Sequence, residues 1–407
     1  MKVVGLISGT SADGVDAVLL EMEEAGPMPR ATLLAYRETP LPPAARERIL
    51  HAASGEGRTR DIALLRRDLG LWFAEATRGL LDAAGVHAGQ VAAVGCHGQT
   101  VWHEPPRESG SRRGTSLQLL DPAVLAAETG IPVVSDFRSA DLAAGGEGAP
   151  LVPWADRVLF SHADDALALQ NLGGMGNVTW LPRRGSGTDP VAFDTGPGNA
   201  LLDVAAGMAS GGRLTHDVDG ALARAGRVDP VLLERLLSDP FFRTPPPRST
   251  GRERFGPALV GALARERGLE PGMLRGWPDL LATLAALTVE SVARAYRAWV
   301  LPLGVDRAVL TGGGARNPVL VEGLRAALAP LPVETGSAAL GMDPDAREAA
   351  AFAVLGFAFL RGVPGNVPGC TGARGERVLG SWTPAPGRVP HPPPLPPTVA
   401  HPAGGAA

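Results

Sequence analysis

The sequence has almost no lysine, and this shortage excludes two large classes of nucleotide-binding protein. Lysine and arginine together number 38 among 407 residues, yet Lys2 is the single lysine. A Walker A loop needs a lysine after its last glycine, and a protein kinase needs one on its third strand. Any use of ATP by this chain must therefore rely on other machinery.

Cysteines and long apolar runs are also scarce. The two cysteines, Cys96 and Cys370, form no disulfide framework and favour a reducing cytoplasm. No apolar run approaches the roughly 20 residues that span a bilayer, and the strand pattern at the N-terminus predicts no signal peptide. A net charge of −4 gives no reason to expect a nucleic-acid or membrane partner.

The remaining composition is that of a globular protein with room for two cores. Hydrophobic residues make up 45% and charged residues 20% of the chain. A length of 407 residues allows two domains with a cleft between them. Stretches typical of strands alternate with amphipathic stretches such as 61–84 and 278–301, which predicts an α/β protein.

The segment that follows the first predicted strand has the composition of a phosphate-binding loop. Residues 3–7 are an apolar strand, residues 17–20 are a second one, and the turn between them carries two hydroxyls and two carboxylates. Glycine lets backbone N–H groups approach an anion, hydroxyls add donors, and a carboxylate can hold hydrated Mg²⁺ against phosphate oxygens. The alternative is an ordinary hairpin turn. The residues concerned are Gly9, Thr10, Ser11, Ala12, Asp13, Gly14, Val15 and Asp16.

Two further segments repeat the pattern of a strand followed by glycines. Residues 166–181 predict a second hairpin around Gly173 and Gly174. Residues 308–317 predict a strand that ends in Gly312, Gly313 and Gly314 and leads into a helix from Pro318. The three segments together suggest a duplicated architecture. By contrast, the proline- and charge-rich segment 243–256 reads as an exposed loop, and the segment from about Trp382 reads as a disordered tail without a chemical role.

Taken together, these motifs resemble the anhydro-N-acetylmuramic acid kinases, a family of the actin-like ATPase and sugar-kinase superfamily. The motifs occur in the family's order from residue 3 to about residue 375. They are 8–16, 97–103, 134–138, 148–153, 171–174, 193–199, 249–253, 312–318, 348–353 and 364–366.

The resemblance implies an α/β fold with two actin-like, ribonuclease H-like domains related by duplication and an inter-domain cleft. We expect a first domain over residues 1–150, completed by a C-terminal helix around 345–375. A second domain is expected over 151–344, followed by the disordered Pro-rich tail over 382–407.

The resemblance also implies a reaction. An enzyme of this family hydrolyses the internal bridge of 1,6-anhydro-N-acetylmuramic acid and phosphorylates the 6-oxygen, using ATP and Mg²⁺, in cytoplasmic peptidoglycan recycling. The expected partner is this small sugar, with no nucleic acid and no membrane; a homodimer stays open. Two alternatives remain: an actin-like sugar kinase that acts on a free hydroxyl, and a non-catalytic nucleotide-dependent sugar sensor.

Catalytic roles follow from the matching positions. Asp194, between an apolar strand end and a glycine turn, is expected to be the general base that activates water and to contact the substrate. The alternative role of Asp194 is to cap that turn or a helix that begins near Asn199. Asp13 is expected to associate with Mg²⁺ through water, with an exposed turn aspartate as the alternative. Asp16 is expected to orient the loop.

Sugar and nucleotide contacts complete the expected site. Thr100, Arg138 and Glu348 are expected to bind the sugar, and the arginine fork suits the lactyl carboxylate of muramic acid. The alternatives are a surface bridge from Arg138 to Asp136 or Asp141 and a solvated Glu348. The phosphate loop, Gly173 and Gly174 are expected to bind ATP, with Gly312, Gly313, Gly314 and Asn317 forming a flat bed for adenine and ribose. His97 and His103 do not form a zinc site, because no third ligand lies nearby in sequence.

Overall fold

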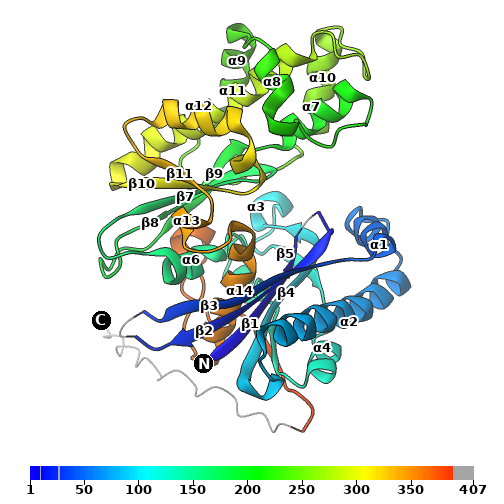
Figure 1. Cartoon of the computed structure of the whole chain (residues 1–407), viewed down its shortest axis with the longest axis vertical. Helices are drawn as coiled ribbons and strands as arrows, with labels where there is room; N and C mark the ends of the chain where they lie inside the picture. The colour runs from blue at the N-terminus through cyan, green and yellow to red at the C-terminus, as the bar shows by residue number, and fades with distance from the viewer. Residues whose placement is uncertain (10, 26–27, 388–407) are drawn as a thin grey trace, which may run out of the picture. The chain divides into compact units, whose positions relative to one another are not determined.

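The chain folds into two compact units in a computed structural model that describes residues 1–9, 11–25 and 28–387. The first unit comprises Met1–Val158 and the chain from Glu348 onward, and the second comprises Leu159–Arg347. Each unit is built on one mixed sheet, as Figure 1 shows. The chain therefore leaves the first unit after residue 158 and returns to it at residue 348.

The strands of the two sheets are as follows. Unit 1 contains β1 (Lys2–Ser8), β2 (Gly14–Glu23), β3 (Arg30–Pro40), β4 (Val91–Glu104), β5 (Thr115–Leu119), β6 (Val133–Ser135) and β12 (Ser381–Thr383). Unit 2 contains β7 (Leu167–Leu172), β8 (Met175–Leu181), β9 (Val191–Pro197), β10 (Arg307–Thr311) and β11 (Val333–Thr335).

The two sheets share one topology. The strand order is β3-β2-β1-β4-β6 in unit 1 and β9-β8-β7-β10-β11 in unit 2. In both, the first three strands form an antiparallel meander, and the first strand pairs in parallel with the fourth. The fourth and fifth strands of each set are also parallel. The prediction of a duplicated, ribonuclease H-like α/β fold is confirmed.

The helices lie between and after these strands. They are α1 (Pro43–Ala53), α2 (Thr59–Ala84), α3 (Pro106–Ser109), α4 (Pro122–Thr129), α5 (Ser139–Ala143), α6 (Val152–Phe160), α7 (Ala200–Ser210), α8 (Ala221–Ala225), α9 (Pro230–Leu237), α10 (Pro257–Glu266), α11 (Trp277–Ala295), α12 (Pro318–Leu328), α13 (Ser337–Leu340), α14 (Arg347–Leu360) and α15 (Pro368–Thr371). The predicted helix over 61–84 is thus α2, and the apolar stretch 278–301 is α11 with the turns that follow it.

Helices cover both faces of the sheet in unit 1. Leu69 and Phe73 of α2 share a core with alternate residues of β1, Val4 and Leu6. Helix α14 packs on the opposite face, where strand glycines let it come close: a Cβ on Gly5 would lie 2.0 Å from the carbonyl oxygen of Ala349. The C-terminal helix is therefore an integral layer of the first unit.

Unit 2 adds a helical layer to its sheet. Helices α11 and α12 cover one sheet face, with Tyr296 and Leu324 in the same core as Val178 and Leu310. Helices α7 to α10 gather around the first half of α11, as Figure 1 shows, and Trp277 is fully buried among them. The loop within this layer that precedes α10, residues 244–256, lies beside β9, where the Asp194 N–H donates to the Arg248 carbonyl oxygen.

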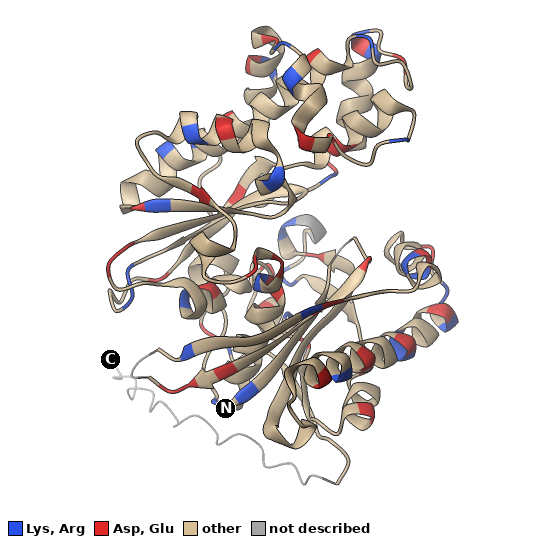
Figure 2. Cartoon of the chain, viewed as in Figure 1, with Lys and Arg blue, Asp and Glu red and all other residues tan. Residues whose placement is uncertain are grey.

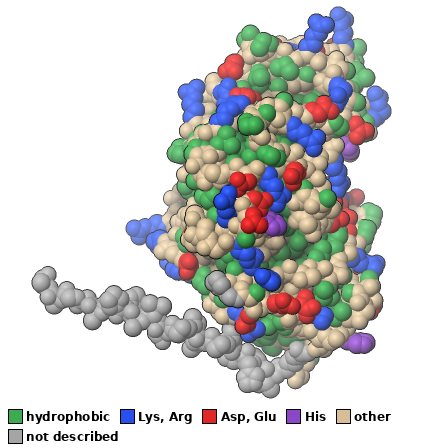
Figure 3. Space-filling model, turned by 60° about the vertical axis from the view of Figure 1, so that its left-hand side comes forward, with side chains coloured by type: hydrophobic (Ala, Val, Ile, Leu, Met, Phe, Trp, Pro, Cys, Tyr) green, Lys and Arg blue, Asp and Glu red, His purple; other side chains and the backbone are tan. Residues whose placement is uncertain are grey.

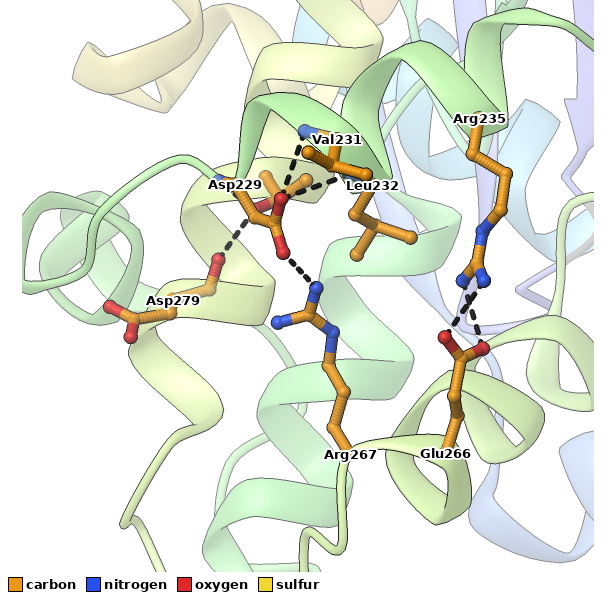
Figure 4. A network of polar contacts seen from close by, with 8 residues as sticks. Asp229, Val231, Leu232, Arg235, Glu266, Arg267 and Asp279 are labelled. Carbon is orange, nitrogen blue, oxygen red and sulfur yellow. Dashed lines mark hydrogen bonds and ion pairs between the residues drawn. The ribbon is translucent and has the colours of Figure 1, made fainter.

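Surface ion pairs tie this helical layer together at its edge (Figure 4). The Asp229 carboxylate caps α9 by accepting the N–H groups of Val231 and Leu232, and it also accepts from Arg267. Arg235 and Glu266 form a two-pronged pair at 2.7 and 2.8 Å. Such exposed pairs contribute about 1 kcal/mol or less each, so the layer depends mainly on its apolar core.

Charges of both signs are interspersed on the surface. Figure 2 shows basic and acidic residues alternating along α2, and the face in Figure 3 mixes both with hydrophobic side chains. Among the described residues, no helix is long and apolar enough to cross a membrane.

Two sequence-based expectations need correction. The chain is still paired at Trp382 and Thr383, because β12 forms an antiparallel pair with β6 and the Trp382 ring stacks on Phe359 at 6.4 Å. The predicted start of the tail at residue 382 is therefore too early. Residues 388–407 lie outside the described residues. The segment 243–256 is not simply an exposed loop, because Arg248 is only 5% exposed and Phe255 only 3%.

Candidate active site

The turn between β1 and β2 presents polar groups on the surface of unit 1. Ser11 and Asp13 are exposed, and the Ser11 hydroxyl donates to the Asp13 carboxylate at 2.7 Å. The turn is closed by the N–H of Ala12, which donates to the carbonyl oxygen of Gly9 at 3.1 Å. Thr10 lies outside the described residues. The turn thus displays a hydroxyl and a carboxylate side by side.

The other predicted loop residues anchor this turn. Ala12 and Val15 are buried in the core, so only their main-chain groups are available to a ligand. Gly14 begins β2, and Asp16, also in β2, accepts a hydrogen bond from the Tyr36 hydroxyl at 2.9 Å. This contact ties Asp16 to the neighbouring strand β3; its role in orienting the loop stays a prediction.

Arg138 is held by two segments of unit 1, β4 and the loop that contains Gly148. Its guanidinium donates to Nε2 of His97 at 2.9 and 3.2 Å and to the carbonyl oxygen of Gly148 at 2.6 Å. Burial and the neighbouring Arg138 hold the pKa of His97 well below its usual range, so the ring is neutral. Its other nitrogen, Nδ1, lies 3.1 Å from the Gly98 carbonyl oxygen, which places the ring proton there and leaves Nε2 as the acceptor.

The alternatives for Arg138 can now be compared with its contacts. Asp136 accepts from Ser139 at 2.6 Å, whereas Asp141 accepts from the Gly148 N–H and from two buried side chains near the C-terminus. A surface bridge from Arg138 to either carboxylate is therefore wrong. Burial lowers the pKa of Arg138 to about 10, while the charges of Glu348 and Asp141 act in the opposite direction.

Thr100 and Glu348 belong to the same unit. Thr100 is a half-buried residue of β4 whose hydroxyl accepts from Gln118 at 3.4 Å. The preceding residue, Gln99, donates to the carbonyl oxygens of Gly9 and Thr100, which links the β1–β2 turn to this strand. Glu348 is exposed in the first turn of α14 and close enough to Arg138 to affect its pKa. Unit 1 therefore brings the predicted sugar residues into one neighbourhood.

Asp194 lies in β9 of unit 2, where it pairs with Asn177 of β8. One carboxylate oxygen, Oδ2, accepts the N–H of Thr250 at 2.8 Å. The helix that follows, α7, has Asn199 rather than Asp194 at its N-cap. The alternative that Asp194 caps this helix is wrong.

The surroundings of Asp194 favour a carboxyl group that exchanges protons near neutrality. Burial raises its pKa to about 7, and nearby Glu253 adds to this effect. The Thr250 N–H and the positive charge of Arg248 act in the opposite direction. A carboxylate with such a pKa is well matched to accept a proton from water at neutral pH.

The predicted glycines of unit 2 form one packed group. A Cβ on Gly312 would lie 2.3 Å from Oδ1 of Asn171, and one on Gly314 would lie 2.7 Å from Cβ of Leu172. Gly312 also has a φ of +76°, which favours glycine. The loop after β10 thus lies directly against the β7–β8 turn that contains Gly173 and Gly174.

A cavity of about 360 Å³ opens at the carboxyl ends of β10 and β11. Its lining comprises Leu310, Thr311, Gly312, Ala315, Arg316, Thr335, Gly336, Ser337 and residues 343–345. The ends of parallel strands are the usual place for ligands in α/β sheets, and the volume is within the range for small molecules. Asn317 lies beside this lining, and its side-chain oxygen caps α12 by accepting the Val319 N–H.

Four residues of the site were not assigned from the sequence. Asn171 and Asn199 contact the glycine loop, while Arg248 and Thr250 contact Asp194. Asn171, Asn199 and Thr250 fall inside the motifs that carry the resemblance, which is a signal that could have found them. Arg248 falls just outside them, in a segment whose composition indicated exposure.

Comparisons with known proteins agree on one family. The family model described as anhydro-N-acetylmuramic acid kinase matches residues 1–385. The anhydro-N-acetylmuramic acid kinase of Gloeobacter violaceus is 45% identical over 383 residues, which cover 94% of this chain and 98% of that protein. The protein of the same name from Streptomyces coelicolor is 45% identical over 411 residues, which cover 100% of both.

A solved structure shows a more distant likeness. The ROK hexokinase from Thermus thermophilus matches with a TM-score of 0.34 and 17% identity, covering 88% of this chain and 100% of that chain. Similarity at this level supports no argument about function.

Proposed function

The chain belongs to the anhydro-N-acetylmuramic acid kinase family, and we propose that it hydrolyses the bridge of 1,6-anhydro-N-acetylmuramic acid and phosphorylates the 6-oxygen with ATP. The observation that carries this proposal is the environment of Asp194. A partly buried carboxylate with a pKa of about 7, held by the Thr250 N–H through one oxygen, suits a general base.

In the proposed reaction, Asp194 accepts the proton of the attacking water. The oxygen of water forms a bond to the anomeric carbon, and its proton passes to Asp194. The bond between the anomeric carbon and the 6-oxygen breaks, and the 6-oxygen takes the γ-phosphoryl group. The products are N-acetylmuramic acid 6-phosphate and ADP.

We assign the nucleotide to two glycine-rich surfaces. The β1–β2 turn would bind phosphates through main-chain N–H groups and the Ser11 hydroxyl. The cavity at the ends of β10 and β11, which Gly312 lines, would take adenine and ribose. Asn317, whose carboxamide oxygen caps α12, would shape this cavity rather than contact the base.

The donors at the β1–β2 turn fit Mg²⁺. The Asp13 carboxylate and the Ser11 hydroxyl are exposed oxygens on one turn. Mg²⁺ usually keeps several waters and takes only one or two carboxylates, so this donor set is sufficient for a water-mediated contact. When bound there, the ion would neutralise charge on the phosphates.

Arg138 is the proposed anchor for the lactyl carboxylate of the sugar. His97 and the Gly148 carbonyl oxygen fix its guanidinium, so little side-chain entropy is lost when a carboxylate binds. Thr100 and Glu348 would contact the sugar hydroxyl and amide groups. The proposed use of ATP and the two free buried cysteines fit a cytoplasmic enzyme; a homodimer stays a prediction.

Product analysis in ¹⁸O-water tests the proposal. With Mg-ATP and the anhydro sugar, we expect one ¹⁸O on the anomeric carbon and phosphate on the 6-oxygen. A kinase for a free hydroxyl would release ADP with open-chain amino sugars and incorporate no solvent oxygen. A sensor would bind without releasing ADP. Either result would overturn the proposal.

A further inference from the structure

Arg248 is a buried cation in the loop beside β9. Its side chain is only 5% exposed, and its donors go to main-chain carbonyl oxygens. Nη1 donates to Thr244 at 2.9 Å and to Phe241 and Phe242 at 3.2 and 3.4 Å, and Nε donates to Asp194 at 2.8 Å. These carbonyl oxygens are neutral, so they accept the hydrogen bonds of Nε and Nη1 without cancelling the charge of the guanidinium.

Aromatic rings complete this environment. The guanidinium carbon lies 4.3 Å from the ring centroid of Trp299, 4.8 Å from that of Phe241 and 5.3 Å from that of Phe193. Ring faces attract a cation and fix the plane of the guanidinium. Burial lowers the pKa of Arg248 to about 10, so the group stays charged at neutral pH.

The loop that carries Arg248 holds Asp194 at three points. The Arg248 side chain donates to the Asp194 carbonyl oxygen, and the Asp194 N–H donates to the Arg248 carbonyl oxygen at 3.1 Å. Two residues later, the Thr250 N–H donates to the Asp194 carboxylate. Main chain and carboxylate are therefore fixed by the same short segment.

We propose that Arg248 is a positioning residue for Asp194: it fastens the loop to β9 through the Asp194 main chain and places a permanent positive charge in the neighbourhood of the carboxylate. This inference rests on the proposed role of Asp194 as the base. Burial alone would protonate such a carboxyl group and disable it. The charge of Arg248 keeps a useful fraction of it ionised.

The charges around Asp194 are few. Arg248 lowers the pKa of Asp194, Glu253 raises it, and Asn177, on the adjacent strand, is neutral. The Thr250 N–H and, after it, the charge of Arg248 thus oppose burial and Glu253. Removing the charge of Arg248, and with it the anchor of the loop that presents the Thr250 N–H, should raise the pKa of Asp194 by about one unit or more.

Titration of the Asp194 carboxyl group by ¹³C NMR tests this directly and needs no activity. The resonance is assigned from its absence in Asp194→Asn. We expect a midpoint near 7 in the unaltered protein, an upward shift of about one unit or more in Arg248→Met, and a midpoint close to the original in Arg248→Lys, which keeps the charge.

Arg307→Met is the matched control. Arg307 is also a partly buried arginine of unit 2, held by Asp165, Glu334 and the Ala339 carbonyl oxygen. Arg307 lies at the start of β10. Thr311, four residues later, is in register with Asp194 across the sheet, and four residues of strand span about 13 Å. Loss of Arg307 should affect stability but not the Asp194 titration.

Turnover gives an independent readout. With its pKa raised by one unit, Arg248→Met should lose about fivefold in kcat at pH 7 and recover toward the original rate at pH 9, with the KM for ATP unchanged. A merely structural defect would not recover with pH. If Arg248→Met does not fold, Arg248→Gln, whose amide still donates to the carbonyls, replaces it in both measurements.

Two results would overturn the inference: a folded Arg248→Met with an unshifted Asp194 titration, or a shift in Arg248→Lys as large as that in Arg248→Met. Failure of the proposed function would look different. The unaltered protein would then not turn over the anhydro sugar, while the titration would still report whether Arg248 controls Asp194.

Discussion

The first turns of the two sheets occupy the same place in the strand order but are built from different chemistry. The β1–β2 turn exposes the Ser11 hydroxyl and the Asp13 carboxylate. The β7–β8 turn has Gly173 and Gly174 at its tip, and their carbonyl oxygens accept the N–H groups of residues 198–200 at the start of α7. One turn keeps side-chain groups available, whereas the other is bonded to its own unit.

The matching third strands differ as well. In unit 1, β3 places Glu38 opposite Asp16, and in unit 2, β9 places Asp194 opposite Asn177. Glu38 is exposed, whereas burial raises the pKa of Asp194 to about 7. The third strand of the duplicated sheet therefore carries an ordinary surface carboxylate in one unit and the proposed base in the other.

The two units therefore share a strand topology but differ in the reactive groups that this topology carries. Unit 1 exposes the proposed phosphate-binding groups on its first turn. Unit 2 uses its first turn to anchor α7 and the glycine loop, and carries its reactive carboxylate one strand further. The predictions below alter each half in turn.

The largest effect should come from Asp194→Asn, which removes the base and keeps the shape. Asparagine cannot accept the proton of water, so turnover should fall by roughly 10²–10⁴-fold, while affinity for the sugar and ATP is retained. Turnover and ligand binding are measured on the same preparation. Near-normal turnover would make Asp194 a structural residue.

The melting temperature of Asp194→Asn tests whether the substitution leaves the fold intact. The pKa of Asp194 is raised on folding, so its ionisation opposes folding, and this cost is absent at low pH and grows as pH rises from about 4 through 7. Asp194→Asn should therefore melt at a higher temperature than the original protein at pH 8. A lower melting temperature would indicate that asparagine disturbs the loop around Thr250.

Asp13→Ala tests the turn of unit 1. We expect a loss of roughly 10²–10³-fold in turnover at limiting Mg²⁺, because groups that stabilise charge on phosphates are typically worth that much. Stability should be unchanged, since Asp13 is exposed. Glu38→Ala is the control, because it removes another exposed carboxylate of the same antiparallel meander. Equal effects of the two substitutions would contradict the assignment.

Gly312→Ala and Gly9→Ala compare the glycines of the two halves. A Cβ on Gly312 would lie 2.3 Å from Asn171 and its φ is +76°, whereas the nearest atom to a Cβ on Gly9 is 3.8 Å away. Gly312→Ala should cost about 1–3 kcal/mol in the free energy of unfolding and weaken nucleotide binding; Gly9→Ala should fold normally. Thermal melting and nucleotide titration check both, and a stable Gly312→Ala would show that the loop can move.

The sequence predicted those parts of the fold that depend on local patterns. Strand–turn–strand alternation around residues 9 and 173, and the strand that ends in Gly312, were sufficient to predict the duplicated sheets. The N-cap role of Asn317 was not predicted, although an asparagine before a proline at a helix start is a local signal for it.

The parts that were missed depend on distant partners. Arg248 follows three prolines and reads as exposed, but carbonyl groups from β9 and from the end of the helical layer satisfy its donors. Strand β12 is only three residues long, and it forms because it pairs with the distant strand β6. Neither partner is visible in the local sequence, and the pKa of Asp194 depends on the same non-local burial.

The pH dependence of kcat with the anhydro sugar tests the central claim most directly. Asp194 must be ionised to accept a proton, so the account predicts that activity falls as pH decreases through about 7, and that Asp194→Asn loses this acid limb together with most of its rate. An acid limb near pH 4, or the same limb at about pH 7 in Asp194→Asn, would contradict the assignment of Asp194 as the base.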